Sequence, residues 1–382
     1  MGYSKMARKS SPPATDDLLS SVSAWRTQYS QLKEEYDELL RRHHESEREF
    51  EEKQKQALAE LQAARERAFD ELRVKCHAER LEREQKLLQV APIGSGDVDA
   101  LPTVRAAYSD RTAAMMAKLS MLTYFAFEDE EKKAILNEIL KHGNITLLHT
   151  IAVDETEAMV AESEKFVAVA FRGTTSRNDV RTDLQARFNV AKVYVDGFPD
   201  EVVVHSGFHA AFMKVKDELE RLLQETGNKP IYFTGHSLGG ALALLASAVL
   251  AGQDKVTGRS GADKIAPRMA AVYTFGAPRV GNEGFGRFVK APHYRVVNRW
   301  DLVPLVPPTW LLNYRHTGMP ILLYSGALEP VRRSPWGLAS FYGLLSVLMW
   351  PFTRSLASAK AHDSALYVER LELIARYRGS LT

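Results

Sequence analysis

"FTGHSLGGALALLAS", residues 233–247, joins two apolar segments of different character. The first, "IYF" at 231–233, is short and β-rich, whereas the apolar run that begins at Ala241 suits a buried helix. One serine, Ser237, stands between them among three glycines. A G-x-S-x-G pentapeptide between a strand and a helix is typical of a sharp turn that exposes the serine hydroxyl at the edge of a sheet. The stretch therefore predicts a strand–turn–helix unit of an α/β fold.

Other short apolar segments predict further strands of the same sheet. They are "FVAVAF" at 166–171, "AAVYTFG" at 270–276 and "YRVVN" at 294–298. Helical stretches separate them, such as "AAMMAKLSMLTYFAF" at 113–127 and "HAAFMKVKDELERLLQE" at 209–225. Because strands alternate with helices, we expect a mostly parallel sheet with helices on both faces.

The composition bounds the class of protein. With 382 residues and 45% hydrophobic content the chain can form a sizeable core, and its net charge of +2 argues against an overall attraction to nucleic acid. One cysteine, Cys76, excludes a disulfide within the chain and fits a reducing compartment. The N-terminal residues include no apolar stretch long enough for a signal peptide, so we expect a cytoplasmic protein.

The chain divides into four segments by composition. Residues 1–15 are rich in Ser, Pro and Lys, which predicts disorder. Residues 16–90 contain neither Gly nor Pro and predict one long helix. The glycines and prolines of residues 91–104 predict a linker. Residues 105–382 contain the strands and helices of the α/β domain.

The segment 16–90 places apolar side chains at spacings that alternate between four and three, as in the seam of a coiled coil. A solvated single helix is the alternative, but aromatic side chains at seam positions favour burial against another copy of the chain. We therefore expect a homo-oligomer through this helix. The seam runs through Leu18, Val22, Trp25, Tyr29, Leu32, Tyr36 and Leu39.

The turn at Ser237 raises the question of which residues would activate its hydroxyl. A serine nucleophile needs a base, and the base needs an acid to orient it, in the chain order Ser, acid, His for sheets of this type. Asp301 follows "YRVVN" in a proline-rich loop, and His362 lies in "KAHDSALYV" before a terminal helix. Ser237, Asp301 and His362 are the candidate catalytic residues, and such a triad requires neither a cofactor nor a metal.

Two backbone N–H groups complete the candidate site as an oxyanion hole. One belongs to Leu238, directly after the serine, and the other to Thr174, in the loop after the strand at 166–171. Arg172 precedes that loop, and we expect it to form a buried salt bridge behind the loop rather than to bind an anion.

Other residues near these motifs are expected to have structural roles. Gly235, His236 and Gly239 form the nucleophile elbow with Ser237, and His236 is expected to pack beneath the turn because adjacent side chains diverge there. A core or hydrogen-bonding role is also expected for the histidines that fit the Ser–acid–His order less well. These are His205, His293 and His316.

Several segments of the α/β domain match one family in order. They are "AKLSMLTY", "VAFRGTTS", "VHSGFHAAF", "FTGHSLGGALALLAS", "YTFGAPRVGN", "RVVNRWDLVPLVPP", "YRHTG" and "HDSALYV". With these segments the domain resembles the class 3 lipases, an α/β-hydrolase family of fungal triacylglycerol lipases with plant and bacterial relatives. The resemblance implies the α/β-hydrolase fold, preceded here by the coiled coil. It also implies Ser237, Asp301 and His362 as the triad, with Thr174 and Leu238 as oxyanion donors.

Two segments depart from the pattern of that family. Residues 177–188, "RNDVRTDLQARF", are more charged than the amphipathic lid of the fungal enzymes. An apolar insertion occupies residues 334–357, and its part 334–353 contains no charged residue. A single membrane span there would separate His362 from Ser237, so the alternatives are a cap over the site, an interfacial helix in peripheral membrane contact, or core.

These observations predict a serine ester hydrolase that cleaves carboxylic esters of acylglycerols through an acyl-enzyme. A phospholipase and a soluble carboxylesterase share the same residues and stay open as alternatives. An alternative of another class is a coiled-coil scaffold whose hydrolase domain binds lipid without catalysis. The expected partners are a lipid or ester substrate and further copies of the chain, and no nucleic acid.

Overall fold

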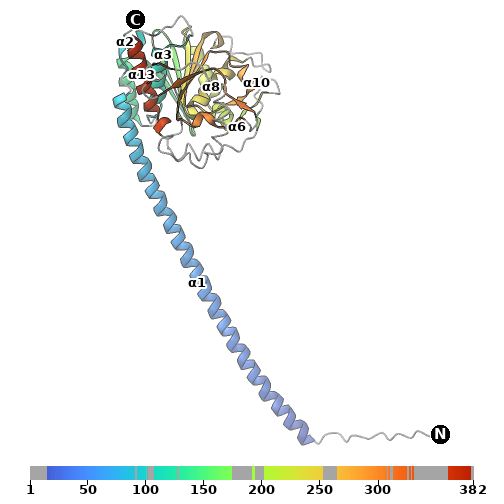
Figure 1. The fold of residues 1–382 in the computed structure, drawn as a ribbon. Coiled ribbons are helices and arrows are strands. Elements are labelled where there is room, and N and C mark those ends of the chain that lie inside the picture. The colour runs from blue at the N-terminus through green and yellow to red at the C-terminus, as the bar shows by residue number, and fades with distance from the viewer. Residues whose placement is uncertain are drawn as a thin grey trace, which may run out of the picture. The chain divides into compact units, whose positions relative to one another are not determined.

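The computed structural model describes residues 15–90, 93–99, 101, 107–125, 127, 129–173, 192–193, 202–252, 265–307, 309, 313–324, 327, 329–330 and 360–379. The chain forms two compact units, residues 1–76 and 77–382. The long helix α1 (Thr15–Val90) makes up the described part of the first unit and ends in the second (Figure 1). Of the helices that the structure describes, none is both long and apolar enough for a membrane crossing.

A seven-stranded sheet forms the centre of the second unit, in the order β1-β2-β3-β6-β7-β9-β11. From β3 to β11 neighbouring strands are parallel, whereas β1 and β2 pair antiparallel at one edge. The sheet is therefore mostly parallel, as predicted. Its strands are β1 (Thr146–Val153), β2 (Thr156–Glu162), β3 (Val167–Phe171), β6 (Ile231–His236), β7 (Met269–Phe275), β9 (His293–Asn298) and β11 (Met319–Leu323).

Helices cover both faces of the sheet (Figure 1). The central strands are buried on both faces because their alternate side chains enter two cores: Ala168 and Ala170 of β3 enter one, and Val167, Val169 and Phe171 enter the other. The first core includes residues of α3 (Asp110–Leu122), α4 (Glu130–His142) and α13 (Ser364–Gly379). The second includes residues of α6 (Ser206–Met213), α7 (Lys216–Glu225) and α8 (Leu238–Ala251).

Local sequence explains where several of these elements begin. At the start of α3 the Ser109 side chain accepts a hydrogen bond from the N–H of Thr112. At the start of α4 the Asp129 side chain accepts hydrogen bonds from the N–H groups of Glu131 and Lys132.

A small second sheet borders the main one, in the order β10-β8-β5-β4. Its strands are β4 (Lys192–Val193), β5 (Val204–His205), β8 (Gly281–Asn282) and β10 (Tyr314–Arg315).

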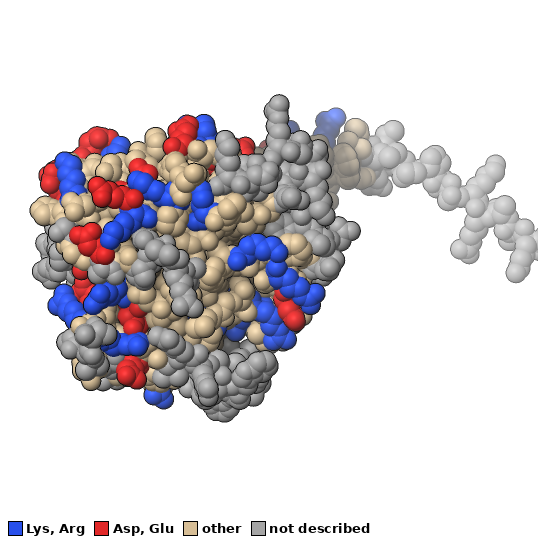
Figure 2. Space-filling view, turned by 90° about the horizontal axis from the view of Figure 1, so that it is seen from above, with Lys and Arg blue, Asp and Glu red and all other residues tan. Residues whose placement is uncertain are grey.

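The predicted strands are present, with three differences elsewhere. The helix expected at 113–127 ends earlier, because α3 stops at Leu122. The segment 209–225, expected as one helix, is divided between α6 and α7, which break at Lys214 and Val215. The edge strands β1 and β2 had not been predicted, because β1 is only partly buried and has no continuous apolar run. Acidic and basic side chains of the second unit are interspersed on the face seen in Figure 2, which agrees with the small net charge.

A mostly parallel sheet with helices on both faces, and with the serine turn between β6 and α8, is the α/β-hydrolase type of fold. In such sheets functional side chains gather at the carboxyl ends of the strands. Ser237 follows β6 and Asp301 follows β9, so both lie at that end. The fold thus brings together loops that are far apart in the sequence.

Candidate active site

Ser237 occupies a strained turn between β6, which ends at His236, and α8, which begins at Leu238. Its backbone has φ 58° and ψ −127°, a conformation that residues other than glycine rarely adopt. The N–H of Ser237 donates a hydrogen bond to the carbonyl oxygen of Phe275 on the neighbouring strand β7, at 2.9 Å. The serine is 3% exposed, so the turn holds its hydroxyl in a fixed and largely enclosed place.

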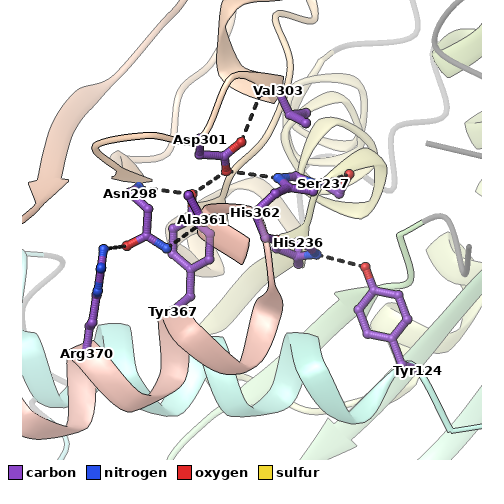
Figure 3. A network of polar contacts seen from close by, with 10 residues as sticks. All are labelled: Tyr124, His236, Ser237, Asn298, Asp301, Val303, Ala361, His362, Tyr367 and Arg370. Atoms are coloured by element: carbon purple, nitrogen blue, oxygen red, sulfur yellow. Dashed lines mark hydrogen bonds and ion pairs between the residues drawn. The ribbon is translucent and has the colours of Figure 1, made fainter. Parts of the chain in front are cut away.

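The three candidate catalytic residues lie in one hydrogen-bonded chain (Figure 3). The Nε2 atom of His362 lies 2.9 Å from Oγ of Ser237, and its Nδ1 atom lies 2.9 Å from Oδ2 of Asp301. His362 lies two residues before the start of α13, more than a hundred residues from the serine turn. The tertiary structure therefore brings a base and a carboxylate to the serine hydroxyl in the order that nucleophilic catalysis uses.

The hydrogen bonds decide which ring nitrogen of His362 carries the proton. An ionised carboxylate only accepts, so Nδ1 donates its N–H to Asp301. In the neutral ring Nε2 then has a free electron pair directed at the hydroxyl of Ser237. This is the tautomer that can take a proton from the serine.

Three hydrogen-bond donors hold Asp301 in place, one of them on α13. The Tyr367 hydroxyl donates to Oδ2 of Asp301 at 2.6 Å, and the N–H of Val303 donates to Oδ1 at 3.0 Å. Burial, and then the nearby charge of Asp301, raise the pKa of Tyr367 well above its usual value, so the phenol stays a neutral donor. With the bond from His362, three donors surround one carboxylate.

Asn298 joins the acid loop to the segment that bears the base (Figure 3). Its backbone N–H donates to the Tyr367 hydroxyl at 3.0 Å, and its side-chain amide donates to the carbonyl oxygen of Ala361 at 2.9 Å. Arg370, one turn after Tyr367 on α13, donates to the amide oxygen of Asn298 at 2.7 Å. Asn298 thus fixes the backbone next to His362 and the loop that leads to Asp301.

His236 braces the other side of the site. Its Nε2 atom lies 2.7 Å from the carbonyl oxygen of His362, and a carbonyl only accepts, so Nε2 carries the hydrogen. In the neutral ring Nδ1 accepts from the hydroxyl of Tyr124, at 2.8 Å. His236 packs beneath the turn as predicted, and it supports the backbone of His362 instead of competing as the base.

The other residues with expected structural roles also have hydrogen-bonding or packing contacts. The ring of His205 stacks on Phe208 with centroids 4.2 Å apart, and Arg172 forms an ion pair with Glu157 of β2. His293 lies 2.9 Å from the Thr274 hydroxyl, and His316 lies 2.6 Å from the carbonyl oxygen of Pro304. These contacts agree with the expectation for Arg172 and for the three histidines.

The candidate oxyanion hole is described in part. Leu238 is the first residue of α8, so its N–H has no acceptor within the helix. Gly173 lies close by, since a Cβ placed on it would come within 3.3 Å of Ser237 Cβ. The loop after β3 thus arrives at the serine. Thr174, the second expected donor, lies outside the described residues, and so do the segments 177–188 and 334–353.

The sequence pointed to Ser237, Asp301 and His362 but missed the residues that support them. Tyr367 follows His362 by five positions, and Tyr124 comes just after α3, yet neither belongs to a local motif that predicts a polar role. Asn298 and Arg370 are similarly ordinary in sequence. Their partners are 63 and 72 residues away along the chain, so only the fold reveals the contacts.

Comparisons with known proteins identify relatives of this chain. Residues 168–310 match the family model described as lipase (class 3). The lipase of Rhizopus niveus is 33% identical over 193 residues, which cover 48% of this chain and 46% of that protein. The chain thus spans about half the length of this relative. The structure of the Rhizomucor miehei triacylglyceride lipase aligns with 59% of this chain and 84% of that chain, at 24% identity and a TM-score of 0.46.

Another relative is covered more completely. The secreted mono- and diacylglycerol lipase MDL3 of Malassezia globosa is 33% identical over 223 residues, which cover 54% of this chain and 69% of that protein. The aligned family segment, residues 168–310, contains the serine turn and Asp301. The chain belongs to the class 3 lipase family.

Proposed function

We propose that the protein is a serine ester hydrolase of the lipase type, acting on carboxylic esters of acylglycerols. The observation that supports this most directly is the hydrogen-bonded chain from Ser237 through His362 to Asp301, with 2.9 Å at each step. Family membership adds to it, because the relatives from Rhizopus niveus and Malassezia globosa are named as lipases.

In the proposed mechanism Ser237 is the nucleophile and His362 the general base. As Oγ attacks the ester carbonyl carbon, Nε2 of His362 takes the hydroxyl proton, and Asp301 stabilises the imidazolium and its orientation. The backbone N–H groups of Leu238 and Thr174 would hold the negative oxygen of the tetrahedral intermediate. Loss of one such donor typically costs about 2.7–4 kcal/mol of transition-state stabilisation.

The second half of the reaction uses the same groups. The imidazolium of His362 gives its proton to the leaving alcohol, and the acyl group stays on Ser237 as an ester. Water then attacks that ester while His362 takes a proton from the water. His362 returns this proton to Oγ of Ser237 as the acyl–oxygen bond breaks, which releases the carboxylic acid and restores the serine. These steps use three side chains and two backbone N–H groups of the protein, together with one water molecule.

Replacing Ser237 with alanine tests the assignment. We expect Ser237→Ala to abolish hydrolysis of p-nitrophenyl butyrate, because it removes the hydroxyl that forms the acyl-enzyme in the proposed mechanism. Circular dichroism and the thermal unfolding midpoint should stay close to those of the wild type, since the hydroxyl is small. Full activity of this variant would contradict the proposal.

A second experiment tests the substrate class. Rates on tributyrin, phosphatidylcholine and short p-nitrophenyl esters would separate an acylglycerol lipase from a phospholipase and from a soluble carboxylesterase. The proposal predicts the highest kcat/KM on tributyrin. A clear preference for phosphatidylcholine would assign the site to phospholipids instead.

The alternative of another class is a scaffold that binds lipid without catalysis. A fluorophosphonate probe reacts covalently with an activated serine, so labelling of the wild type but not of Ser237→Ala would exclude a purely binding role. Absence of labelling in both would favour the scaffold. The cytoplasmic location stays a prediction. The membrane contact of residues 334–353 also stays a prediction, because that segment lies outside the described residues.

We also propose that α1 associates with another copy of the chain. Its seam side chains are open to solvent in the described unit: Trp25 is 67%, Tyr29 59% and Tyr36 64% exposed. Large apolar side chains in a regular row are unfavourable in water, and pairing with an equivalent row would bury them.

A further inference from the structure

A small pocket beside the loop after β7 has walls that are unusually rich in positive charge. It has about 260 Å³ of space that atoms do not fill, part of it open to solvent, and its enclosed part holds about one water molecule. Side chains from β7, β9 and the segment 315–317 meet there. The polar residues that line it are Thr274, His293, Arg295, Arg315, His316 and Thr317.

Arg295 is the central charge of this pocket. Its neighbours across the sheet are Thr274 of β7 and Pro320 of β11, and neither can neutralise it. The Nε atom of Arg295 is fully enclosed and has no hydrogen-bond partner. Burial alone lowers the pKa of this guanidinium to about 10, so it keeps its charge at neutral pH without help from any acid.

Two more arginines add to the positive charge. Arg279 lies next to the pocket, and its Nη1 atom donates hydrogen bonds to the carbonyl oxygens of Leu305 and Pro307. Burial, and then repulsion by Arg295 and Arg315, lower the pKa of Arg279 to about 10. In the described part of the chain, no carboxylate lies within ion-pair distance of any of these three arginines.

The histidines of the pocket do not change its net positive charge. Burial, and then the charge of Arg295, lower the pKa of His293 to about 3, and His316 is shifted in the same direction for the same reasons. Both rings are therefore neutral at pH 7. They supply polar walls, while three guanidinium groups supply about three positive charges.

Buried or half-buried charges are normally paired, because an unpaired charge loses its hydration without compensation. Guanidinium groups favour phosphate and carboxylate oxygens, with which they form paired hydrogen bonds. The enclosed part of the pocket has room for one such oxygen, and the rest of the anion can lie in the part open to solvent. Several positive charges favour an anion with more than one negative charge.

We propose that this pocket binds a phosphate group, which supplies the negative charge that Arg279, Arg295 and Arg315 lack. Two sources share this chemistry: free inorganic phosphate and the phosphate monoester head group of an anionic lipid. None of Ser237, Asp301 and His362 lines this pocket, so the proposed site goes beyond the proposed hydrolase activity. All its tests use the full chain with Ser237→Ala, in which hydrolysis plays no part.

The first experiment measures the thermal unfolding midpoint against the concentration of sodium phosphate, with sodium chloride holding the ionic strength constant. We expect a saturable rise for the parent protein. Arg295→Met should lose that rise, and Arg315→Gln, at the exposed rim, should need at least tenfold more phosphate. Arg221→Gln, which changes an exposed arginine of α7, is the matched control and should respond like the parent.

A separate prediction follows from the missing counter-charge. Without phosphate, Arg295→Met should unfold at a higher urea concentration than the parent, because the substitution removes an uncompensated charge. The proposal is overturned if chloride and phosphate act alike at equal ionic strength. It is also overturned if acetate matches phosphate, or if Arg295→Met and Arg315→Gln both keep the full response.

The second experiment separates the two sources. Flotation with phosphatidylcholine vesicles, with and without phosphatidic acid, measures binding of the parent, Arg315→Gln and Arg221→Gln. Binding that needs phosphatidic acid and is lost only in Arg315→Gln would assign the pocket to a lipid head group. Saturable stabilisation by inorganic phosphate without vesicle binding would assign it to the free anion, and absence of both effects would overturn the proposal.

Discussion

At the scale of single residues, the candidate site depends on a strained serine held by its surroundings. A backbone conformation like that of Ser237 typically costs about 1–3 kcal/mol and persists only where neighbouring contacts impose it. Here the N–H of Ser237 is tied to Phe275, and Oγ faces His362. The strain is localised where the proposed mechanism needs the serine hydroxyl held against the imidazole of His362.

Tyr367→Phe tests the support of Asp301. The change removes the 2.6 Å hydrogen bond to Oδ2 and leaves the buried N–H of Asn298 without its acceptor. We expect kcat/KM on p-nitrophenyl butyrate to fall about tenfold, mainly in kcat, which corresponds to about 1.4 kcal/mol. Tyr377→Phe, at a more exposed position of the same helix, should change kcat little. If the two variants had equal kinetics, the hydrogen bond from Tyr367 to Asp301 would have no role in catalysis.

His293 predicts a dependence of stability on pH. Its folded pKa of about 3 lies below the ordinary value of 6.5, so the unfolded chain binds a proton more readily between these limits. Stability is therefore lost as pH falls below 6.5. From pH 7.5 to pH 5 this residue should account for about 2 kcal/mol of the fall in the free energy of unfolding.

His293→Gln removes the titration and keeps a polar group near Thr274. Urea unfolding at pH 7.5 and pH 5 should show a fall that is about 2 kcal/mol smaller in the variant than in the wild type. An unchanged difference between the two pH values would mean that His293 is not buried in neutral form. The comparison within each protein cancels any constant loss of stability caused by the substitution.

At the scale of elements, α13 connects the catalytic loops to the rest of the fold. It packs against α3 in the first core and forms two ion pairs with it: Lys118 with Glu372 at 2.5 Å, and Arg378 with Asp110 at 2.7 Å. Lys118 is 4% exposed, and its second acidic partner is Asp97, at 3.3 Å. The helix that presents Tyr367 and Arg370 is thus anchored along its length.

Glu372→Gln tests this anchoring. The substitution leaves the buried ammonium of Lys118 with a weaker set of partners, and we expect the free energy of unfolding to fall by about 2–3 kcal/mol. Arg376→Gln is the control, because Arg376 is largely exposed and pairs with the same glutamate. That change should cost less than about 1 kcal/mol in urea unfolding. Similar losses for the two variants would contradict the special role of Lys118.

At the scale of the whole molecule, the two units differ in the solvent exposure of their apolar side chains. The second unit buries its apolar residues in two cores, whereas the seam of α1 is exposed in the single chain. An isolated helix gains little stability from its own hydrogen bonds and normally relies on packing. Self-association of α1 would give the first unit the packing that it lacks as a monomer.

Sedimentation equilibrium tests this self-association. We expect the wild type to have a solution mass that is a multiple of 42.8 kDa. Replacing Tyr29 and Tyr36 together by glutamate should shift it toward a single chain, because charges at seam positions cannot be buried. The double change Thr27→Glu and Gln31→Glu adds the same charge off the seam and should leave the mass unchanged. A single-chain mass for the wild type would rule out the proposal.

Part of this protein could be predicted from sequence because the relevant signals are local. Short β-rich apolar runs specified the central strands, and the glycines around Ser237 specified the turn between β6 and α8. The order of serine, acid and histidine along the chain was enough to select Asp301 and His362 as candidates. Each of these inferences uses neighbouring residues or chain order, which the sequence contains directly.

The tertiary structure decided what depends on contacts between distant segments. The antiparallel pair β1 and β2 takes its place in the sheet through the pairing of β2 with β3. Gly276, with φ 59°, has no room for a side chain because Asp301 and His362 converge on it. The network of Tyr367, Asn298 and Arg370, and the unpaired charge of Arg295, arise in the same way. Hydrogen bonds and charges at such separations acquire their partners only when the chain has folded.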